Sequence, residues 1–191
     1  IIQMDEREAI TADIANCLYA GIMTDTGSFR HPSTTAKVHI IVADLINLGA
    51  NVNYVSREIY DTNSLSRLRY LGYALSDKLV VKADLQVAYL TVSSDDFEKF
   101  QLKSGDTEGI VNYALSIRGI VMASIIIERK EEVKLSFRSI GNYSVNTFAS
   151  EHFNGGGHKN ASGGSSKKKK KKTVEKFERL IQDYKDKYRD R

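Results

Sequence analysis

The sequence predicts an α/β protein in two parts, a mainly helical first part followed by a part in which strands and helices alternate. Apolar residues recur at helical spacing up to about Leu75. From Leu79 onward, four segments rich in valine, isoleucine, leucine and phenylalanine alternate with helix-like pieces, which favours a mixed sheet. A length of 191 residues suits one domain plus part of another.

The first part begins with an amphipathic helix that starts near Ile10 and is expected to break at Gly21. We interpret residues 22–23 as a short strand leading into a polar turn that carries Asp25. The clearest helix of the chain should follow, with Ser33 as its N-cap and Gly49 as its C′ residue.

Two shorter helical stretches come next, at 52–59 and 64–75, and the second has leucines on one side and arginines among the other positions. We therefore expect a connector helix between the two parts. The expected domains have these bounds: 1–60, 61–77 for the connector helix, 78–166, and 167–191 for a lysine run and a C-terminal helix.

The second part should contain four strands, of which the last two form a hairpin across charged residues. The expected strands are 79–81, 87–92, 120–128 and 133–138. The helices expected beside them are 95–101 with Ser94 as a cap, 108–115, 145–152, and a last helix containing residues 174–184.

The excess positive charge of the chain is concentrated in one segment. The net charge is +4, but Lys167 to Lys172 contribute six positive charges, so the remaining residues carry −2. A hexalysine can bind phosphates, but a solvated linker is the interpretation that we favour. Partners that carry phosphates must therefore be inferred from local sites.

The composition, with 41% hydrophobic and 27% charged residues, is ordinary for a soluble globular protein. No apolar run approaches twenty residues, so no membrane span is expected. The first residues do not resemble a secretory signal, and Cys17 has no partner for an internal disulfide. We expect a cytoplasmic protein, and the sequence leaves open whether it forms a homodimer.

A glycine-rich segment is the first candidate for chemistry. Gly155, Gly156, Gly157 and His158 run directly into residues 159–164 (KNASGG). Successive glycines can bring backbone amides close to an anion, and the imidazole of the following histidine can lie beside the same anion. The alternative is a flexible turn with an incidental histidine.

Two further segments supply charged candidates. Asp25 lies in residues 21–31 (GIMTDTGSFRH), and hard cations such as Mg²⁺ or Mn²⁺ take carboxylate oxygens, although Asp25 could instead stabilise its own turn. Arg30 in the same segment suits phosphate contact. In 134–139 (KLSFRS), Ser136 and Arg138 share one strand face, where a guanidinium can grip phosphate or simply face solvent.

These segments together resemble a known superfamily. The segment GIMTDTGSFRH resembles the fourth motif of the DHH phosphoesterases, and SFRS followed by GGGHKNASGG resembles their DHHA1 domain. The resemblance covers essentially residues 1–166 and is strongest to the bifunctional oligoribonuclease and PAP phosphatase group. It implies the C-terminal part of an α/β DHH domain, a helical connector, and an α/β DHHA1 domain with a mixed sheet.

The resemblance also implies roles for individual residues. Asp25 would bind a catalytic manganese of a two-metal site, with Mg²⁺ as the alternative ion. Arg138, Ser136, Arg30 and the segment 155–158 would hold substrate phosphate. His158 would either donate a hydrogen bond to the phosphate or act as a catalytic acid, and the sequence does not separate these roles. The aspartate pair and DHH triplet of the family are absent from these residues, which implies that they precede Ile1 in a longer protein.

The expected function of the intact protein is manganese-dependent hydrolysis of short oligoribonucleotides or 3′-phosphoadenosine 5′-phosphate (PAP), with metal-activated water attacking phosphorus. The 191 residues alone are expected to be inactive. The alternatives are a non-catalytic module that binds nucleic acid or nucleotide, and a hydrolase of cyclic dinucleotides or polyphosphate.

Overall fold

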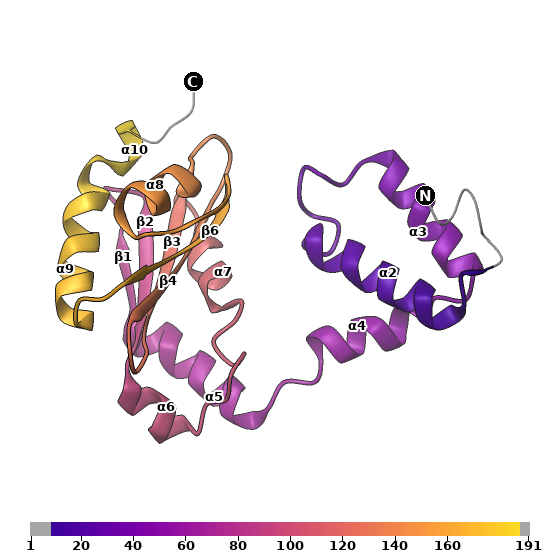
Figure 1. Ribbon diagram of the computed structural model, residues 1–191, viewed down its shortest axis with the longest axis horizontal. Helices are drawn as coiled ribbons and strands as arrows, with labels where there is room; N and C mark the ends of the chain where they lie inside the picture. The colour runs from indigo at the N-terminus through magenta and orange to yellow at the C-terminus, as the bar shows by residue number, and fades with distance from the viewer. Residues whose placement is uncertain (1–8, 188–191) are drawn as a thin grey trace. The chain divides into compact units, whose positions relative to one another are not determined.

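The computed structural model describes residues 9–187, and the chain divides into two compact units between Asn63 and Ser64 (Figure 1). The expected end of the first domain, after residue 60, lies close to this division. Expectations that fall on residues 1–8 and 188–191 lie outside the described residues.

In the first unit, the described residues form three helices of more than one turn: α2 (Ala12–Asp25), α3 (Ala36–Asn47) and α4 (Val52–Tyr60). They pack around a small apolar core. Its buried residues are Ile10, Ala15, Tyr19, Met23, Val42, Leu45, Ala50 and Val55. Residues 9–63 contain helices and turns but no strand, so the strand that we expected before Asp25 is wrong.

Helix α2 continues through Gly21, where a helix break was expected. The helix ends at Thr26 instead, whose hydroxyl donates to the carbonyl of Ile22 at 2.7 Å. The next residues, Gly27, Ser28 and Phe29, all have positive φ angles of 56° to 63°, which a right-handed helix cannot accommodate. The local hydrogen bonds of Thr26 and this left-handed turn decide the end of the helix.

Helix α3 begins two residues later than expected. Thr35, not Ser33, is its N-cap, and its hydroxyl accepts a hydrogen bond from the amide of Val38 at 3.4 Å. At the other end Gly49 follows the C-cap with a φ angle of +98°, which confirms its role as the C′ residue.

The second unit contains a six-stranded mixed sheet in the order β1-β2-β3-β4-β6-β5. Strands β2 and β3 are parallel, and all other neighbours are antiparallel. The four expected strands are confirmed, including the hairpin of β3 with β4. The strands are β1 (Leu79–Lys82), β2 (Val87–Val92), β3 (Met122–Glu128), β4 (Val133–Ser139), β5 (Gly156–His158) and β6 (Ala161–Ser166).

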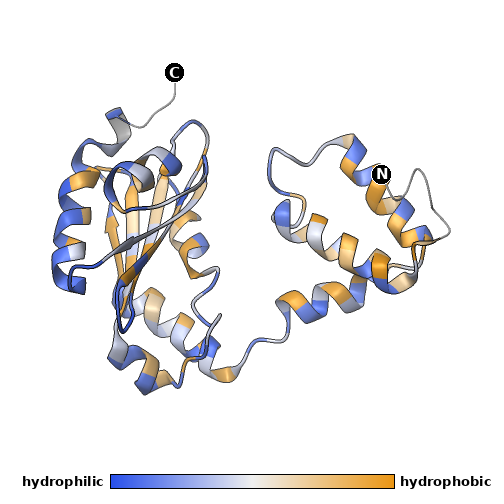
Figure 2. Ribbon diagram, in the orientation of Figure 1, coloured by the Kyte–Doolittle hydropathy of each residue, from blue (hydrophilic) through white to orange (hydrophobic). Residues whose placement is uncertain are grey.

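Helices cover both faces of the sheet, and Figure 1 shows α9 and α7 on opposite sides. One apolar core lies under α8 and α9, and the other lies under α5, η2 and α7. Figure 2 shows apolar colouring along β2 and β3, which lie between these cores. The remaining elements are α5 (Leu65–Tyr73), the π-helical η2 (Ala74–Lys78), α6 (Ser94–Phe100), α7 (Ile110–Leu115), α8 (Val145–His152), α9 (Lys170–Leu180), η3 (Ile181–Asp183) and α10 (Tyr184–Lys187).

The expected connector helix belongs to the second unit. Tyr70 of α5 and Ala74 of η2 are buried in the same core as Leu90 of β2 and Ile125 of β3. Burial of apolar surface is what fixes a helix to a sheet, so α5 and η2 are part of the sheet domain and not a free spacer.

The lysine run is not a linker along its whole length, because α9 begins inside it at Lys170. The Nζ atom of Lys170 lies 3.4 Å from a carboxylate oxygen of Glu128, and Thr173 is fully buried. Further along, Phe177 and Ile181 insert into the core beneath the sheet. The favoured linker interpretation is therefore wrong for Lys170 to Lys172, which apolar docking of the following turns orders, whereas residues 167–169 are exposed and connect β6 to α9.

Among the helices between residues 9 and 187, none alone is long and apolar enough to cross a membrane. Helices α3 and α4 meet that criterion only as a pair, with a bend of 110° at their junction.

Candidate functional site

The sheet register places Arg138 and His158 on the same face. Arg138 of β4 lies opposite Ala161 of β6, and Ala161 lies opposite His158 of β5. Directly opposed residues share a sheet face, so the two polar side chains flank the methyl group of Ala161. Neighbouring strands are about 4.8 Å apart, so the two backbones are separated by roughly 10 Å. Side chains of this length can converge on one small group between them.

The adjacent row of the same face is small and polar. Ser136 of β4 lies opposite Gly163 of β6, which in turn lies opposite Gly156 of β5. Two glycines beside a serine leave the backbone open to close approach by a ligand. The two rows together form what we call the β4-β6-β5 floor: Ser136, Arg138, Gly156, His158, Ala161 and Gly163.

The Arg138 guanidinium is half-buried and has no carboxylate partner among residues 9–187. Its Nη1 atom donates to the carbonyl of the preceding residue, Phe137, at 2.9 Å. Burial lowers the pKa of Arg138, because the charged form loses hydration that no neighbouring anion replaces. A partly dehydrated cation of this kind attracts an anionic ligand, and phosphate matches the fork of its donors.

The glycine run forms a strand, whereas the sequence led us to expect a loop that presents its amides to an anion. A Cβ atom on Gly155 would collide with the carbonyl oxygen of Gly163, and one on Gly157 would lie 2.7 Å from the carbonyl oxygen of Ala161. The φ angle of Gly157 is +146°, which side-chain-bearing residues rarely adopt. Close pairing with β6 therefore requires these glycines.

The amides of Gly155 and Gly157 have partners outside the β5–β6 ladder. The amide of Gly155 donates to the carbonyl of Ala149 at 3.2 Å, and that of Gly157 donates to Oδ1 of Asn146 at 2.9 Å. The Gly157 amide is thus engaged by Asn146 in this structure, and its contact with a phosphate stays a prediction. The polar surface of the floor comes mainly from side chains.

His158 is exposed at the end of β5, and its carbonyl accepts a hydrogen bond from the Ser162 hydroxyl at 2.8 Å. This bond fixes the backbone of the β5–β6 turn and leaves the imidazole at the surface. Its assignment as a catalytic residue stays a prediction.

Sequence reasoning missed two asparagines that position the floor. Asn146, in the first turn of α8, holds β5 through Gly157. Asn160, in the β5–β6 turn, donates through Nδ2 to the Ser139 hydroxyl at 2.9 Å and to the Tyr143 carbonyl at 3.1 Å. Asparagine in a tight hairpin turn is a usable sequence signal, but its long-range partners depend on the fold.

The candidates of the first unit lie around the left-handed turn that follows α2. Asp25 is exposed at the last position of α2, and its carbonyl oxygen lies 3.2 Å from Nδ1 of His31. Arg30 is also exposed, and its Nε atom donates to the carbonyl of Gly27 at 2.8 Å. Arg30 and Arg138 belong to different units, and a contact of Arg30 with substrate phosphate stays a prediction.

Asp25 does not form a metal centre with other residues of the described chain. Between residues 9 and 187 no three histidine, cysteine or carboxylate side chains lie close enough together to hold an ion. Two-metal sites require several bridging and terminal ligands. The described residues therefore do not fit a complete two-metal site.

The β4-β6-β5 floor lies within the part of the chain that matches a known domain. Residues 84–190 match the DHHA1 domain family. The chain is 30% identical over 144 residues to the bifunctional oligoribonuclease and PAP phosphatase NrnA of Bacillus subtilis, covering 75% of this chain and 44% of that protein. It is 32% identical over 155 residues to the protein of the same name from Thermus thermophilus, covering 78% of this chain and 43% of the relative.

A solved structure has the same fold. The crystal structure of an exopolyphosphatase-related protein from Bacteroides fragilis superimposes with a TM-score of 0.91 at 37% identity, over 97% of this chain and 54% of that one. The chain thus spans less than half the length of these two curated relatives. The family resemblance read from the two motifs is confirmed. The chain belongs to the DHH/DHHA1 superfamily, and residues 84–190 are its DHHA1 domain.

Proposed function

We propose that the second unit holds the phosphate of a short oligoribonucleotide or of PAP in a phosphoesterase. Arg138 grips the phosphate, Ser136 donates a further hydrogen bond, and His158 closes the site from β5. The main support for this proposal is the half-buried Arg138 guanidinium, which lacks a carboxylate partner in residues 9–187 and shares a sheet face with His158. The names of the two NrnA relatives support the class of substrate.

For the complete protein we propose Mn²⁺ as the metal, with Asp25 as one ligand and Mg²⁺ as the alternative ion. Hard cations of this type bind carboxylate oxygen, and Asp25 is exposed. The remaining ligands are not among the described residues, so hydrolysis belongs to a protein that supplies them. We also propose a cytoplasmic location, on the basis of the single cysteine.

The binding part of the proposal is tested on the 191-residue chain by calorimetric titration with PAP. Arg138→Ala and His158→Ala should each weaken binding by about tenfold or more, because each removes a charge-assisted or polar contact to phosphate. Lys130→Ala, which removes an exposed cation from the β3–β4 turn, is the matched control and should change affinity by less than about twofold. Unchanged affinity in both site variants would exclude the assignment.

The catalytic part requires the complete protein, assayed for Mn²⁺-dependent release of mononucleotide. Parallel assays with a short RNA, PAP, cyclic di-AMP and polyphosphate would identify the substrate class. A non-catalytic binding module is the second candidate, since Arg138, Ser136 and His158 share one sheet face that needs no metal to hold a phosphate. That candidate predicts PAP binding without hydrolysis at any metal concentration.

A further inference from the structure

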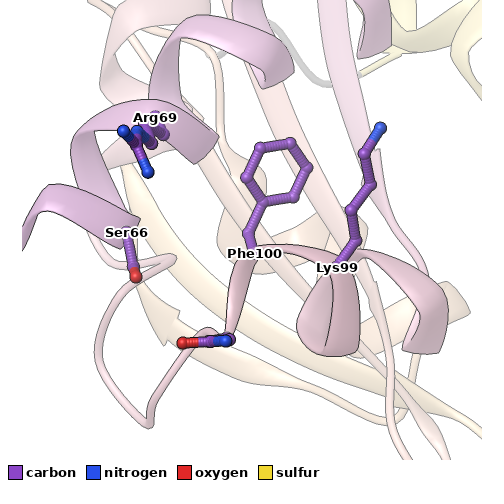
Figure 3. A pocket seen from close by; sticks show the side chains of 5 residues that line it. Ser66, Arg69, Lys99 and Phe100 are labelled. Atoms are coloured by element: carbon purple, nitrogen blue, oxygen red, sulfur yellow. The ribbon is translucent and has the colours of Figure 1, made fainter.

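A polar pocket lies between α5 and α6 in the second unit, built from residues other than the β4-β6-β5 floor. Its volume is about 430 Å³, and it is lined by Ser66, Arg69, Lys99, Phe100 and Gln101. Figure 3 shows the Phe100 ring between Arg69 of α5 and Lys99 of α6. We propose that this α5–α6 pocket binds a nucleotide, with its base against Phe100 and its phosphate held by the cations Arg69 and Lys99 that flank the ring.

The cations of the pocket are available to an anion. Arg69 is exposed, and its guanidinium has no ion pair or hydrogen bond to any group that the structure describes. The Nζ atom of Lys99 lies 4.6 Å from the centre of the Tyr73 ring and 5.2 Å from that of Phe100, and it too has no described carboxylate partner. An ammonium group over aromatic rings keeps its hydrogen-bond donors free for a phosphate.

The aromatic ring is held in place before any ligand binds. Phe100 stacks on Tyr73, with ring centroids 5.0 Å apart and planes at 30°, and it meets the buried Tyr70 edge-on at 5.3 Å. Phe100 is only half-buried by these contacts, so part of the ring remains accessible. A fixed aromatic surface binds a nucleobase at a low entropic cost.

The walls of the pocket are equally fixed. Ser66 and Arg69 are three residues apart on α5, so they lie on one helix face. Arg67 of the same helix donates to the carbonyls of Gly105 and Glu108, at 2.7 Å each, and so ties the loop after α6 to α5. Gln101 ends α6 in the left-handed conformation, where glycine or asparagine is usual, and its side chain lines the pocket.

The combination of groups selects the chemistry of the ligand. Two cations with a hydroxyl and an amide suit phosphate oxygens, and the ring suits a planar apolar group. The volume lies within the range of about 300–1,000 Å³ typical of small-molecule sites, which is more than a bare phosphate needs. A nucleotide carries both parts, either as a free mononucleotide or as one unit of a single strand.

The inference does not rest on the proposed function, and NMR titration separates the two. In the ¹⁵N-labelled 191-residue chain, adenosine 5′-monophosphate should shift the amide signals of Ser66, Arg69 and residues 99–101. Signals of residues 156–158 report independently on the β4-β6-β5 floor. Adenosine and inorganic phosphate should each bind the pocket at least about tenfold more weakly than the nucleotide, because each offers only one half of the contacts. A trinucleotide RNA distinguishes a strand-binding site from a mononucleotide site.

The double variant Arg69→Ala/Lys99→Ala should lose at least about tenfold in affinity at the pocket. Lys130→Ala again controls for general charge and should leave the pocket signals unchanged. The proposal is overturned if no pocket signals shift, if the double variant binds as well as the parent chain, or if phosphate alone binds as tightly as the nucleotide. Phe100→Leu, which keeps an apolar side chain, should weaken the nucleotide and leave phosphate binding unchanged.

Discussion

The side-chain oxygen of Asn146 accepts a hydrogen bond from the backbone amide of Gly157 at 2.9 Å, and this bond ties helix α8 to strand β5. Strand β5 is short and lies at the edge of the sheet, next to β6 alone. A three-residue edge strand has little pairing of its own, so a side-chain bond from a neighbouring helix fixes its place. His158 depends on that placement.

We predict that Asn146→Ala weakens PAP binding at only a modest cost to the stability of the fold. Loss of one hydrogen bond costs about 0.5–1.5 kcal/mol of stability. The freed β5 should let His158 move away from Arg138, so calorimetric affinity should fall by about threefold to tenfold, as expected for a lost interaction of that size. Asn112→Ala, at an exposed position of α7, is the matched control. Equal affinity of both variants would contradict a positioning role for Asn146.

Gly155→Ala should strongly destabilise the second unit. The added methyl group would collide with the carbonyl oxygen of Gly163, a backbone atom that cannot move without breaking the β5–β6 pair. We expect a loss of about 2 kcal/mol or more in urea unfolding. Gly72→Ala in α5 makes the same chemical change with no atom within 4 Å, and it should be neutral or stabilising by up to about 1 kcal/mol. Similar losses in both variants would refute the argument from close strand approach.

Asp96 should make the second unit sensitive to acid. Burial alone would raise the pKa of Asp96, but hydrogen bonds from Ser93 and the ion pair with Lys78 at 3.4 Å outweigh it and lower the pKa. A lowered folded-state pKa means that the carboxylate contributes stability at neutral pH and loses that contribution as the pH falls through the lowered pKa.

The variant Asp96→Asn should therefore cost about 1–2 kcal/mol at pH 7 through the weakened capping box, and its stability should depend less on pH in the acid range. Thermal unfolding of both proteins from pH 7 to pH 2.5 measures this. Asp95→Asn, one residue earlier on the same helix, is exposed and serves as the control. Parallel pH profiles for the parent chain and Asp96→Asn would disprove the assignment.

Phe177→Ala should show that α9 belongs to the fold of the second unit. Phe177 is fully buried and its ring centroid lies 5.4 Å from that of Tyr89 on β2. Truncation of a buried phenylalanine costs about 3–5 kcal/mol. Glu175→Ala, exposed on the same helix, should change stability by less than about 0.5 kcal/mol. A stable Phe177→Ala variant would mean that α9 is only loosely attached.

Much of the secondary structure could be predicted from the sequence because its signals are local. Strands β2 to β4 stand out by their runs of β-branched and aromatic residues, and α8 was predicted at its observed bounds, Val145–His152. The caps of α3 and α6 were each misplaced by one or two residues, at Ser33 and Ser94 in place of Thr35 and Ser93. Neighbouring serines and threonines are equally good N-cap candidates until the backbone conformation at each of them is known.

The candidate site was only partly predictable. Period-two alternation put Ser136 and Arg138 on one face of β4, and the register extends that face to His158. The partners Asn146 and Asn160 carried no comparable signal, because their bonds join segments that only the fold brings together.

The sequence by itself determined the two-part division, the mixed-sheet domain and the chemical character of Arg138 and His158, since these follow from local periodicity and residue type. Tertiary structure alone decided that the glycine run is an edge strand, because its geometry depends on close contact with β6. It likewise decided that the lysine run opens a docked helix, because buried Phe177 and Ile181 outweigh the repulsion between neighbouring lysines. Both outcomes depend on packing between distant segments, which no local pattern encodes.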